Sequence, residues 1–352
     1  MTTPTAKTMP VRRRVSIVAA IVILTLVPAL VMLPVTALGT GSMQVAASWA
    51  SIPAIVGIFA AVAGGRRFAV IVAIVMGFLA PLSIVAGLSP VSGAALMALL
   101  CLVVGRLARY GLHKSALLVP VMLAWPLIDP PTWSGQTTVD RTDTPYLLWM
   151  AAIFFVGAII PALAVPLLLR KRRMPVPQTH SQHEAVVYTV VITILVTVST
   201  FYVLDNPKLF GGAFLIAAIL VLAPIGNAQT LRPTLLRILG TLIGSVLVIA
   251  IVSQVDSLAL IYLIGLVMIV IALMSRLGKH GWIYYVFMVP ATASLNATTL
   301  TQVGQLSTQR VVDNVIGGVL VLLASVLSIG YSRWAGRHDL LPSDEPETSA
   351  IA

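Results

Sequence analysis

The chain has 352 residues, of which 59% are hydrophobic and only 9% are charged, and its mean hydropathy is +1.01. Soluble domains carry roughly 25% charged residues, so this composition excludes a water-soluble protein and places the chain in a bilayer. The net charge of +11 comes from small basic clusters between long apolar runs, a pattern typical of membrane-flanking anchors and not of a nucleic-acid-binding face.

Long apolar runs bounded by charged residues, Gly or Pro predict about twelve transmembrane helices of ~20 residues each. The spans predicted in the first half are 15–38, 44–63, 68–88, 91–105, 115–129 and 146–169. Those predicted in the second half are 185–204, 209–226, 234–253, 257–275, 281–297 and 311–331. The first run is too long for the apolar core of a signal peptide, so we expect a retained helix. The expected fold is therefore an all-helical membrane protein.

The predicted spans divide the chain into five parts. They are a cytoplasmic N-terminal tail (1–14), a first six-helix repeat (15–169), a basic cytoplasmic linker (170–184), a second six-helix repeat (185–331) and a cytoplasmic C-terminal tail (332–352). The distribution of basic residues fixes this orientation. With twelve spans and a cytoplasmic N-terminus, only Arg141, Lys208 and Arg310 of the 22 Lys and Arg residues fall outside, as the positive-inside rule requires. We expect a multi-pass protein of a bacterial plasma (inner) membrane with both termini cytoplasmic.

An internal repeat with an offset of 170 residues relates the two halves. It pairs the segment that begins GRLARYGLHK at Gly105 with the one that begins SRLGKHGWIY at Ser275. The identities include Arg106 with Arg276 and Pro120 with Pro290, and Arg109 pairs with Lys279. Because each half holds an even number of spans, the halves enter the membrane in the same sense. They are predicted to be parallel repeats about a pseudo-two-fold axis along the membrane normal.

Two short spans, 115–129 and 281–297, each contain a proline in matching positions, Pro120 and Pro290. Proline frees a backbone carbonyl and kinks a helix, and paired interrupted segments of this kind indicate a transporter's binding site. Proline is also simply commoner in membrane helices than in soluble ones, so the structural interpretation stays open.

Arg237, Gly240, Thr241 and Gly244 form the segment RILGTLIG at the start of the ninth span. Small residues at this spacing favour a close helix crossing. The arginine is expected either to extend toward the cytoplasmic interface or to attract an anion. Together with Arg106, Arg276 and Lys279, it would line a basic inner mouth.

Arg310 and Asp313 are predicted to face each other on the outer first turn of the twelfth span. One interpretation is a pair that stabilises a helix end, and the other is a gate or a proton-accepting acid at the outer mouth. No acidic residue is expected at the middle of a span, which leaves a channel or uniporter open as well.

The segment TLRPTLLRILGTLIGSVL (230–247), with QRVVDNVIGGVL (309–320), resembles the fusaric acid resistance family of aromatic acid exporters. Arg237, Gly240, Thr241 and Gly244 match its Arg-x-x-Gly-Thr-x-x-Gly helix. Arg310, Asp313 and Gly317 match its later Arg-x-x-Asp-x-x-x-Gly helix. The resemblance implies export of small, often aromatic, organic anions and kinship with plant aluminium-activated malate channels. Many members carry a large cytoplasmic domain between the halves, and this chain has only a short linker there.

The leading functional prediction is an integral membrane transporter that exports organic anions or lipophilic acids between the two halves. A flippase or assembly subunit for lipid-linked envelope precursors, and a transporter of the major facilitator type, remain alternatives. The loop AVAGGRR lacks the acid that major facilitators carry there. No catalytic constellation or metal-ligand cluster is present, so neither an enzyme nor a cofactor is expected. Expected partners are membrane lipids and the anion, with a second copy or an envelope protein left open.

Overall fold

The computed structural model describes residues 51–131, 139–168, 179–206, 212–223, 225, 231–277, 283–296 and 300–337. Within these ranges all regular structure is helical, which confirms the all-helical part of the predicted fold; the arrangement of twelve spans in two repeats stays a prediction. Six of the described helices are long and apolar enough to cross a membrane. The predicted span 15–38, most of the linker and most of the C-terminal tail lie outside the described residues.

The first half contributes α3 (Ser51–Ala86), α4 (Pro90–Ala108), α5 (His113–Ala116), α6 (Leu118–Ile128) and α7 (Thr144–Leu168). The second half contributes α8 (Gln182–Asp205), α9 (Gly212–Leu222), α10 (Leu231–Val252), α11 (Leu258–Leu277), α12 (Ile283–Asn296) and α13 (Leu300–Arg337). Most boundaries lie close to those expected from hydropathy. The clear exception is α13, which begins well before residue 311 and continues beyond residue 331.

Helix α3 combines two predicted spans that meet at Gly65, whose φ of 73° interrupts the helix. A Cβ atom added at Gly57 would collide with the Ala158 backbone, and one added at Gly77 would lie 2.8 Å from Phe155 Cβ. In a straight helix, positions twenty residues apart are separated by about 30 Å. Here both abut α7 within one turn, so the chain folds back at Gly65 into two arms. These arms correspond to the predicted spans 44–63 and 68–88.

The two short proline-containing segments are present as predicted. In the first half, α5 and α6 are separated at Leu117, and Pro120 is the third residue of α6. In the second half, α12 has only 14 residues and contains Pro290. Both prolines are buried, so these short segments lie inside the bundle.

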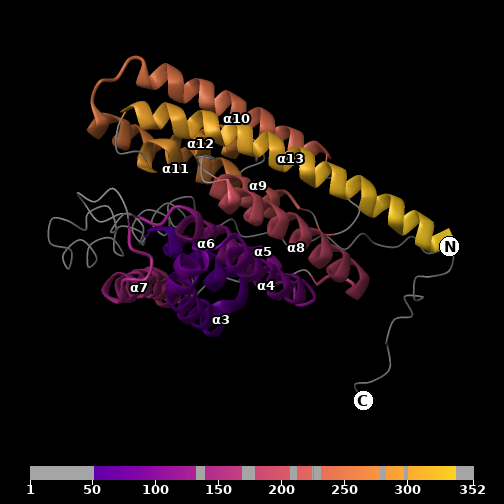
Figure 1. Ribbon diagram of the computed structural model, residues 1–352. Coiled ribbons are helices and arrows are strands. Elements are labelled where there is room, and N and C mark those ends of the chain that lie inside the picture. The colour runs from indigo at the N-terminus through magenta and orange to yellow at the C-terminus, as the bar shows by residue number, and fades with distance from the viewer. Residues whose placement is uncertain are drawn as a thin grey trace, which may run out of the picture.

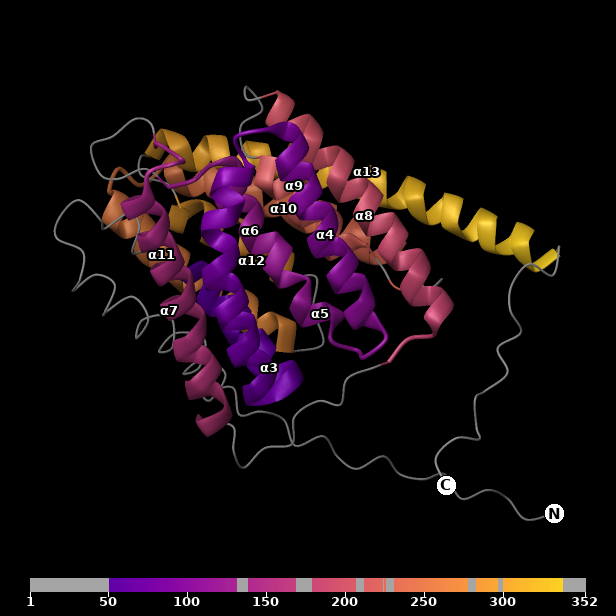
Figure 2. The same ribbon diagram turned by 60° about the horizontal axis from the view of Figure 1, so that its bottom comes forward.

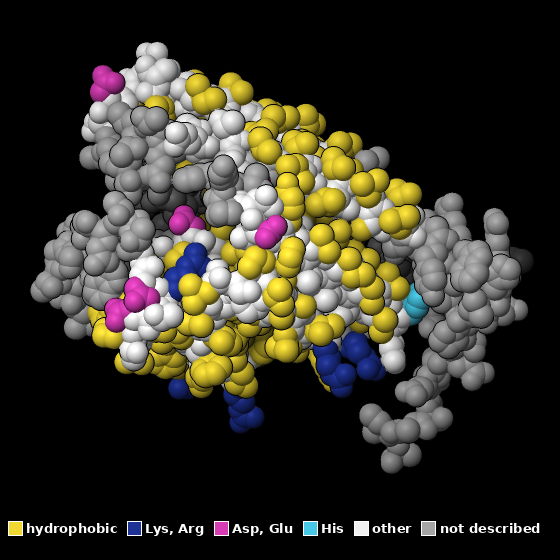
Figure 3. Space-filling view, viewed as in Figure 1, with side chains coloured by type: hydrophobic (Ala, Val, Ile, Leu, Met, Phe, Trp, Pro, Cys, Tyr) yellow, Lys and Arg dark blue, Asp and Glu magenta, His cyan; other side chains and the backbone are white. Residues whose placement is uncertain are grey.

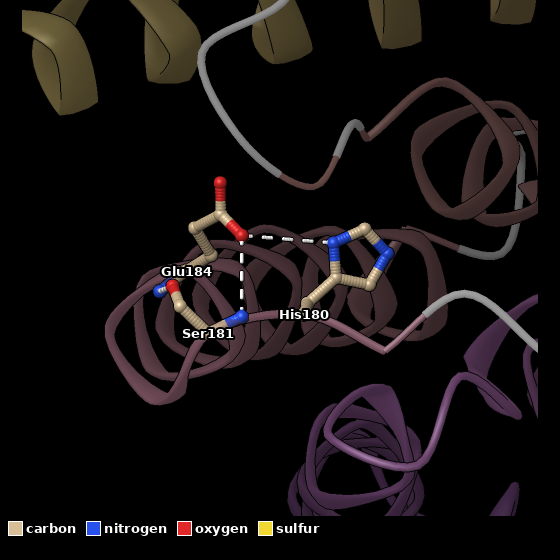
Figure 4. A network of polar contacts seen from close by, with 3 residues as sticks. All are labelled: His180, Ser181 and Glu184. Carbon is tan, nitrogen blue, oxygen red and sulfur yellow. Dashed lines mark hydrogen bonds and ion pairs between the residues drawn. The ribbon is translucent and has the colours of Figure 1, made fainter. Parts of the chain in front are cut away.

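Helix α8 begins with a capping box that fixes where the second half starts (Figure 4). Ser181 Oγ accepts a hydrogen bond from the Glu184 backbone N–H at 3.2 Å, and the Ser181 N–H donates to Glu184 Oε2 at 3.3 Å. His180 Nδ1 lies 3.7 Å from the same carboxylate. The His180 ring also contacts the buried His113 ring edge to face, with centroids 5.0 Å apart. This contact holds the start of α8 against α5.

The helices form two groups in Figure 1, with α3–α7 on one side, α10–α13 on the other, and α8 and α9 between them. In the first group α3 packs against α7 and α6. In the second group α13 packs against α10, and it also packs against α9, which lies between the groups. The groups meet where α4 packs on α8 and α6 packs on α9. Figure 2 shows α4 and α8 side by side and the C-terminal part of α13 projecting beyond the other helices.

Hydrophobic side chains cover most of the described surface seen in Figure 3. Large apolar side chains such as Val198, Val246 and Leu327 are exposed on α8, α10 and α13. A soluble protein does not expose apolar area on this scale, so this surface is suited to lipid.

Candidate functional site

Two arginines approach each other between α10 and α13. Arg237 Nε donates a hydrogen bond to Asn314 Oδ1 at 2.8 Å, and Asn314 Nδ2 donates to the Arg310 carbonyl oxygen at 2.8 Å. Asn314 therefore connects the α10 arginine to the turn of α13 that carries the second arginine. Arg310 is 8% exposed, and the Arg237 charge acts on it across the interface.

Aromatic rings flank both guanidinium groups. Arg310 Cζ lies 4.0 Å from the centroid of the Phe214 ring on α9, and Arg237 Cζ lies 5.8 Å from that of Tyr285 on α12. Phe214 in turn meets Trp125 of α6 edge to face, with centroids 5.2 Å apart. Guanidinium groups over aromatic faces are stabilised by about 0.5–2 kcal/mol, more where water is excluded. The site thus combines positive charge with flat apolar surface, and Trp125 brings the first half to its edge.

Asp313 lies one turn beyond Arg310 on α13 and is 4% exposed. Its Oδ1 accepts a hydrogen bond from Gln309 Nε2 at 3.1 Å. Its Oδ2 is buried and has no donor among the described residues. A buried carboxylate with one unsatisfied oxygen costs several kcal/mol unless a charge or a proton compensates it.

Small residues bring the helices of the site close together. A Cβ atom added at Gly244 would collide with the Val286 carbonyl and lie 3.2 Å from Pro290 Cδ on α12. One added at Gly317 would lie 2.8 Å from Ala218 Cβ on α9. Ser245 Oγ donates to the Ser307 carbonyl at 3.1 Å and joins α10 to α13. The close crossing predicted for the RILGTLIG segment is therefore present, and it positions the two arginines.

The structure brings together part of the predicted set. Five of its members are buried on α10, α12 and α13, next to Arg237 on α10: Gly240, Thr241, Pro290, Arg310 and Asp313. Arg106 is exposed in the last turn of α4, outside this cluster, and Pro120 is buried in α6 of the first half. Arg276 lies on α11, but its side chain is not described, and Lys279 is outside the described residues.

Two roles were left open for Arg237, extension toward the cytoplasmic interface and attraction of an anion. Its guanidinium group turns inward, and Nε donates a hydrogen bond to Asn314 Oδ1; both roles stay predictions.

The predicted start of the twelfth span is wrong. Arg310 and Asp313 were expected in the first turn of a helix beginning at residue 311. Helix α13 begins at Leu300, so both lie inside the candidate span Val303–Leu327 and are not an end-of-helix pair. Asp313 is therefore an acidic residue near the middle of a span, which the sequence analysis had excluded.

Several residues of the site were missed. Asn314 follows Asp313 directly and lies four residues after Arg310, a spacing that places it on the same helix face as the arginine. That spacing could have identified Asn314. Phe214, Tyr285 and Trp125 stand in apolar runs with no local feature to distinguish them from lipid-facing aromatics.

The described helices are those of a multi-pass membrane protein. Residues 196–324 match the family model described as fusaric acid resistance protein-like, which confirms the resemblance predicted from the two motifs. The matched stretch includes α9 to α12 and both arginines. No curated protein and no solved structure matches the chain.

Proposed function

We propose that the protein exports small organic anions of the aromatic type or lipophilic acids, which bind between Arg237 and Arg310. The observation that carries this proposal is the pair of arginines set beside aromatic rings inside an apolar helical bundle. A carboxylate in a membrane interior needs a positive, hydrogen-bonding partner, and arginine offers planar, bidentate recognition. The rings of Phe214 and Tyr285 would contact the flat apolar body of the anion.

We propose further that the site belongs to a twelve-helix protein made of two parallel six-helix repeats. The offset of 170 residues supports this, and so does the packing of the two halves. In the first half α7 packs on both arms of α3, and in the second α13 packs on α9 and α10. Likewise α6 packs on α3, and α12 packs on α10. The path would run along the boundary between the halves, where Trp125 meets Phe214.

The apolar surface supports a location in a plasma (inner) membrane (Figure 3), and the distribution of basic residues along the sequence supports two cytoplasmic termini. Membrane lipids would be its immediate partners.

The test is efflux of radiolabelled benzoate from proteoliposomes that contain the full chain. Wild-type protein should release benzoate faster than empty liposomes, and Arg310→Gln should remove the difference. Arg66→Gln, which changes an exposed arginine outside the cluster, is the matched control and should transport as wild type does. Size-exclusion chromatography in detergent would show that each variant is folded. Equal efflux by wild type and Arg310→Gln, or no efflux of any aromatic carboxylate, would overturn the proposal.

A further inference from the structure

Asp313 carries the same charge as the proposed substrate, so it would not hold the anion itself. Its contacts also give no structural reason for a buried carboxylate at this position. It lies inside the candidate span Val303–Leu327 and is 4% exposed. Gln309 satisfies one carboxylate oxygen, whereas Oδ2 is buried with no donor in the described part of the chain. A residue that served only packing would be less costly as an apolar or amide side chain.

Among the described residues, few charged or titratable side chains act on Asp313 or on the arginine next to it. Arg310, one turn earlier on α13, attracts it, and Arg237 of α10 and Tyr284 of α12 act on Arg310 in turn. Helix α9 carries no titratable residue between Gly212 and Leu222. The charged group that acts most directly on Asp313 is therefore Arg310, to which the substrate anion is also proposed to bind.

We infer that Asp313 and the substrate anion compete for the charge of Arg310, so that Asp313 takes up a proton when the anion binds. This inference rests on the proposed anion site. Two negative groups that share one buried arginine repel each other strongly in a medium of low dielectric constant. Protonation removes that repulsion: a proton from water adds to the Asp313 carboxylate to give a neutral carboxylic acid. The proton returns to water when the anion leaves, and no other bond forms or breaks.

This linkage has a defined direction. The complex holds more protons than the empty site, so the affinity for the anion rises as pH falls. A single linked proton limits the change to about tenfold for each pH unit. Weak organic acids cross membranes in neutral form and acidify the interior when they dissociate. The exporter would therefore bind its substrate most tightly when the cytoplasm has been acidified.

The experiment measures binding of benzenesulfonate to the full chain in detergent by isothermal titration calorimetry. A sulfonate stays ionised across the range from about pH 8 to about pH 6, so any proton taken up must come to the protein. Titration in two buffers of different ionisation enthalpy gives the number of protons bound. Wild-type protein should take up close to one proton per anion at the upper end of this range. Its affinity should tighten by up to about tenfold for each unit of pH lowered.

Asp313→Asn removes the titrating group while keeping the shape of the side chain. This variant should bind the sulfonate tightly at every pH and take up no proton. The matched control is Asp143→Asn, which changes the exposed acid at the equivalent position of the repeat and should behave as wild type does. Asp313→Glu, which keeps an ionisable group, should retain proton uptake.

Three outcomes are distinguishable. Failure of wild-type protein to bind any aromatic anion at any pH would overturn the proposed function. Binding by wild type without proton uptake would overturn only the linkage, and this result needs no variant. Unchanged proton uptake in a folded Asp313→Asn protein would also overturn the assignment to Asp313.

Discussion

Two arginine–aspartate pairs, Arg141 with Asp143 and Arg310 with Asp313, stand at similar positions of the two proposed repeats but differ in burial. In the first half, Arg141 donates to the backbone carbonyls of Leu127 and Ile128, at 2.9 and 3.0 Å, and Asp143 is exposed just before α7 begins. In the second half, Arg310 and Asp313 are buried, about three and about three and a half turns after the start of α13. The two pairs therefore share residue types but not surroundings. One pair closes the end of a helix, and the other supplies charge to the interior.

The difference arises from where the two helices begin. Helix α7 begins at Thr144, immediately after its pair, whereas α13 begins at Leu300, ten residues before Arg310. The extra turns are held by buried contacts, including Val303, Leu306 and the hydrogen bond from Ser245 to Ser307. The longer helix places Arg310 inside the bundle, whereas Arg141 lies just before α7 begins.

The largest effect is expected from substituting Arg310, in comparison with Arg141. Arg310→Gln should lower benzoate transport by roughly a hundredfold, because a charge-assisted interaction with the anion is lost in a buried site. Arg141→Gln should leave transport within about twofold of wild type and slightly lower thermal stability, since partly exposed hydrogen bonds are worth about 1 kcal/mol. Efflux from proteoliposomes and a thermal melt in detergent measure the two quantities. Equal loss of transport in both variants would show that the halves contribute alike.

A second comparison concerns Arg237 and Arg67, which also stand 170 residues apart. Arg237 reaches Asn314 on α13, whereas Arg67 is exposed just after the turn at Gly65. Arg237→Gln should raise the KM for benzoate by roughly tenfold to thirtyfold, and Asn314→Ala by a smaller factor, because the arginine loses its anchor. Arg67→Gln should leave KM unchanged. A change in KM for Arg67→Gln comparable to that for Arg237→Gln would contradict the single site.

The helical fold and most helix boundaries could be predicted from the sequence, because hydropathy sets span length; the orientation inferred from the basic residues stays a prediction. The turn at Gly65, the short segments with Pro120 and Pro290, and the close crossing at Gly244 all follow from local residue types. The site could be predicted only in part. The polar stretch LTQVGQLSTQ (300–309) reads as a loop, and only tertiary contacts make it helical. The partner of Arg237 lies 77 residues away, so no local pattern could indicate which way its side chain turns.

The smallest effect is expected from glycines at close helix contacts, which are present in both halves. Gly77 abuts α7, and Gly317 of α13 abuts α9, each with an added Cβ only 2.8 Å from its nearest neighbour. Gly77→Val and Gly317→Val should each lower stability by about 1–3 kcal/mol through overpacking. Gly304→Ala is the matched control. Nothing lies within 4 Å of its added Cβ, so helix propensity alone predicts a gain of up to about 1 kcal/mol. Destabilisation by Gly304→Ala equal to that of the valine variants would contradict the packing described for both halves.

The central claim, an anion site between Arg237 and Arg310, is tested most directly by a cryo-electron microscopy structure of the full chain in nanodiscs with 4-iodobenzoate. The iodine gives strong density that locates the ring. The account predicts density for the ring beside Phe214 and Tyr285, with the carboxylate within hydrogen-bonding distance of both guanidinium groups. A ligand bound elsewhere, with Arg237 still donating to Asn314 and no density beside Phe214, would contradict it.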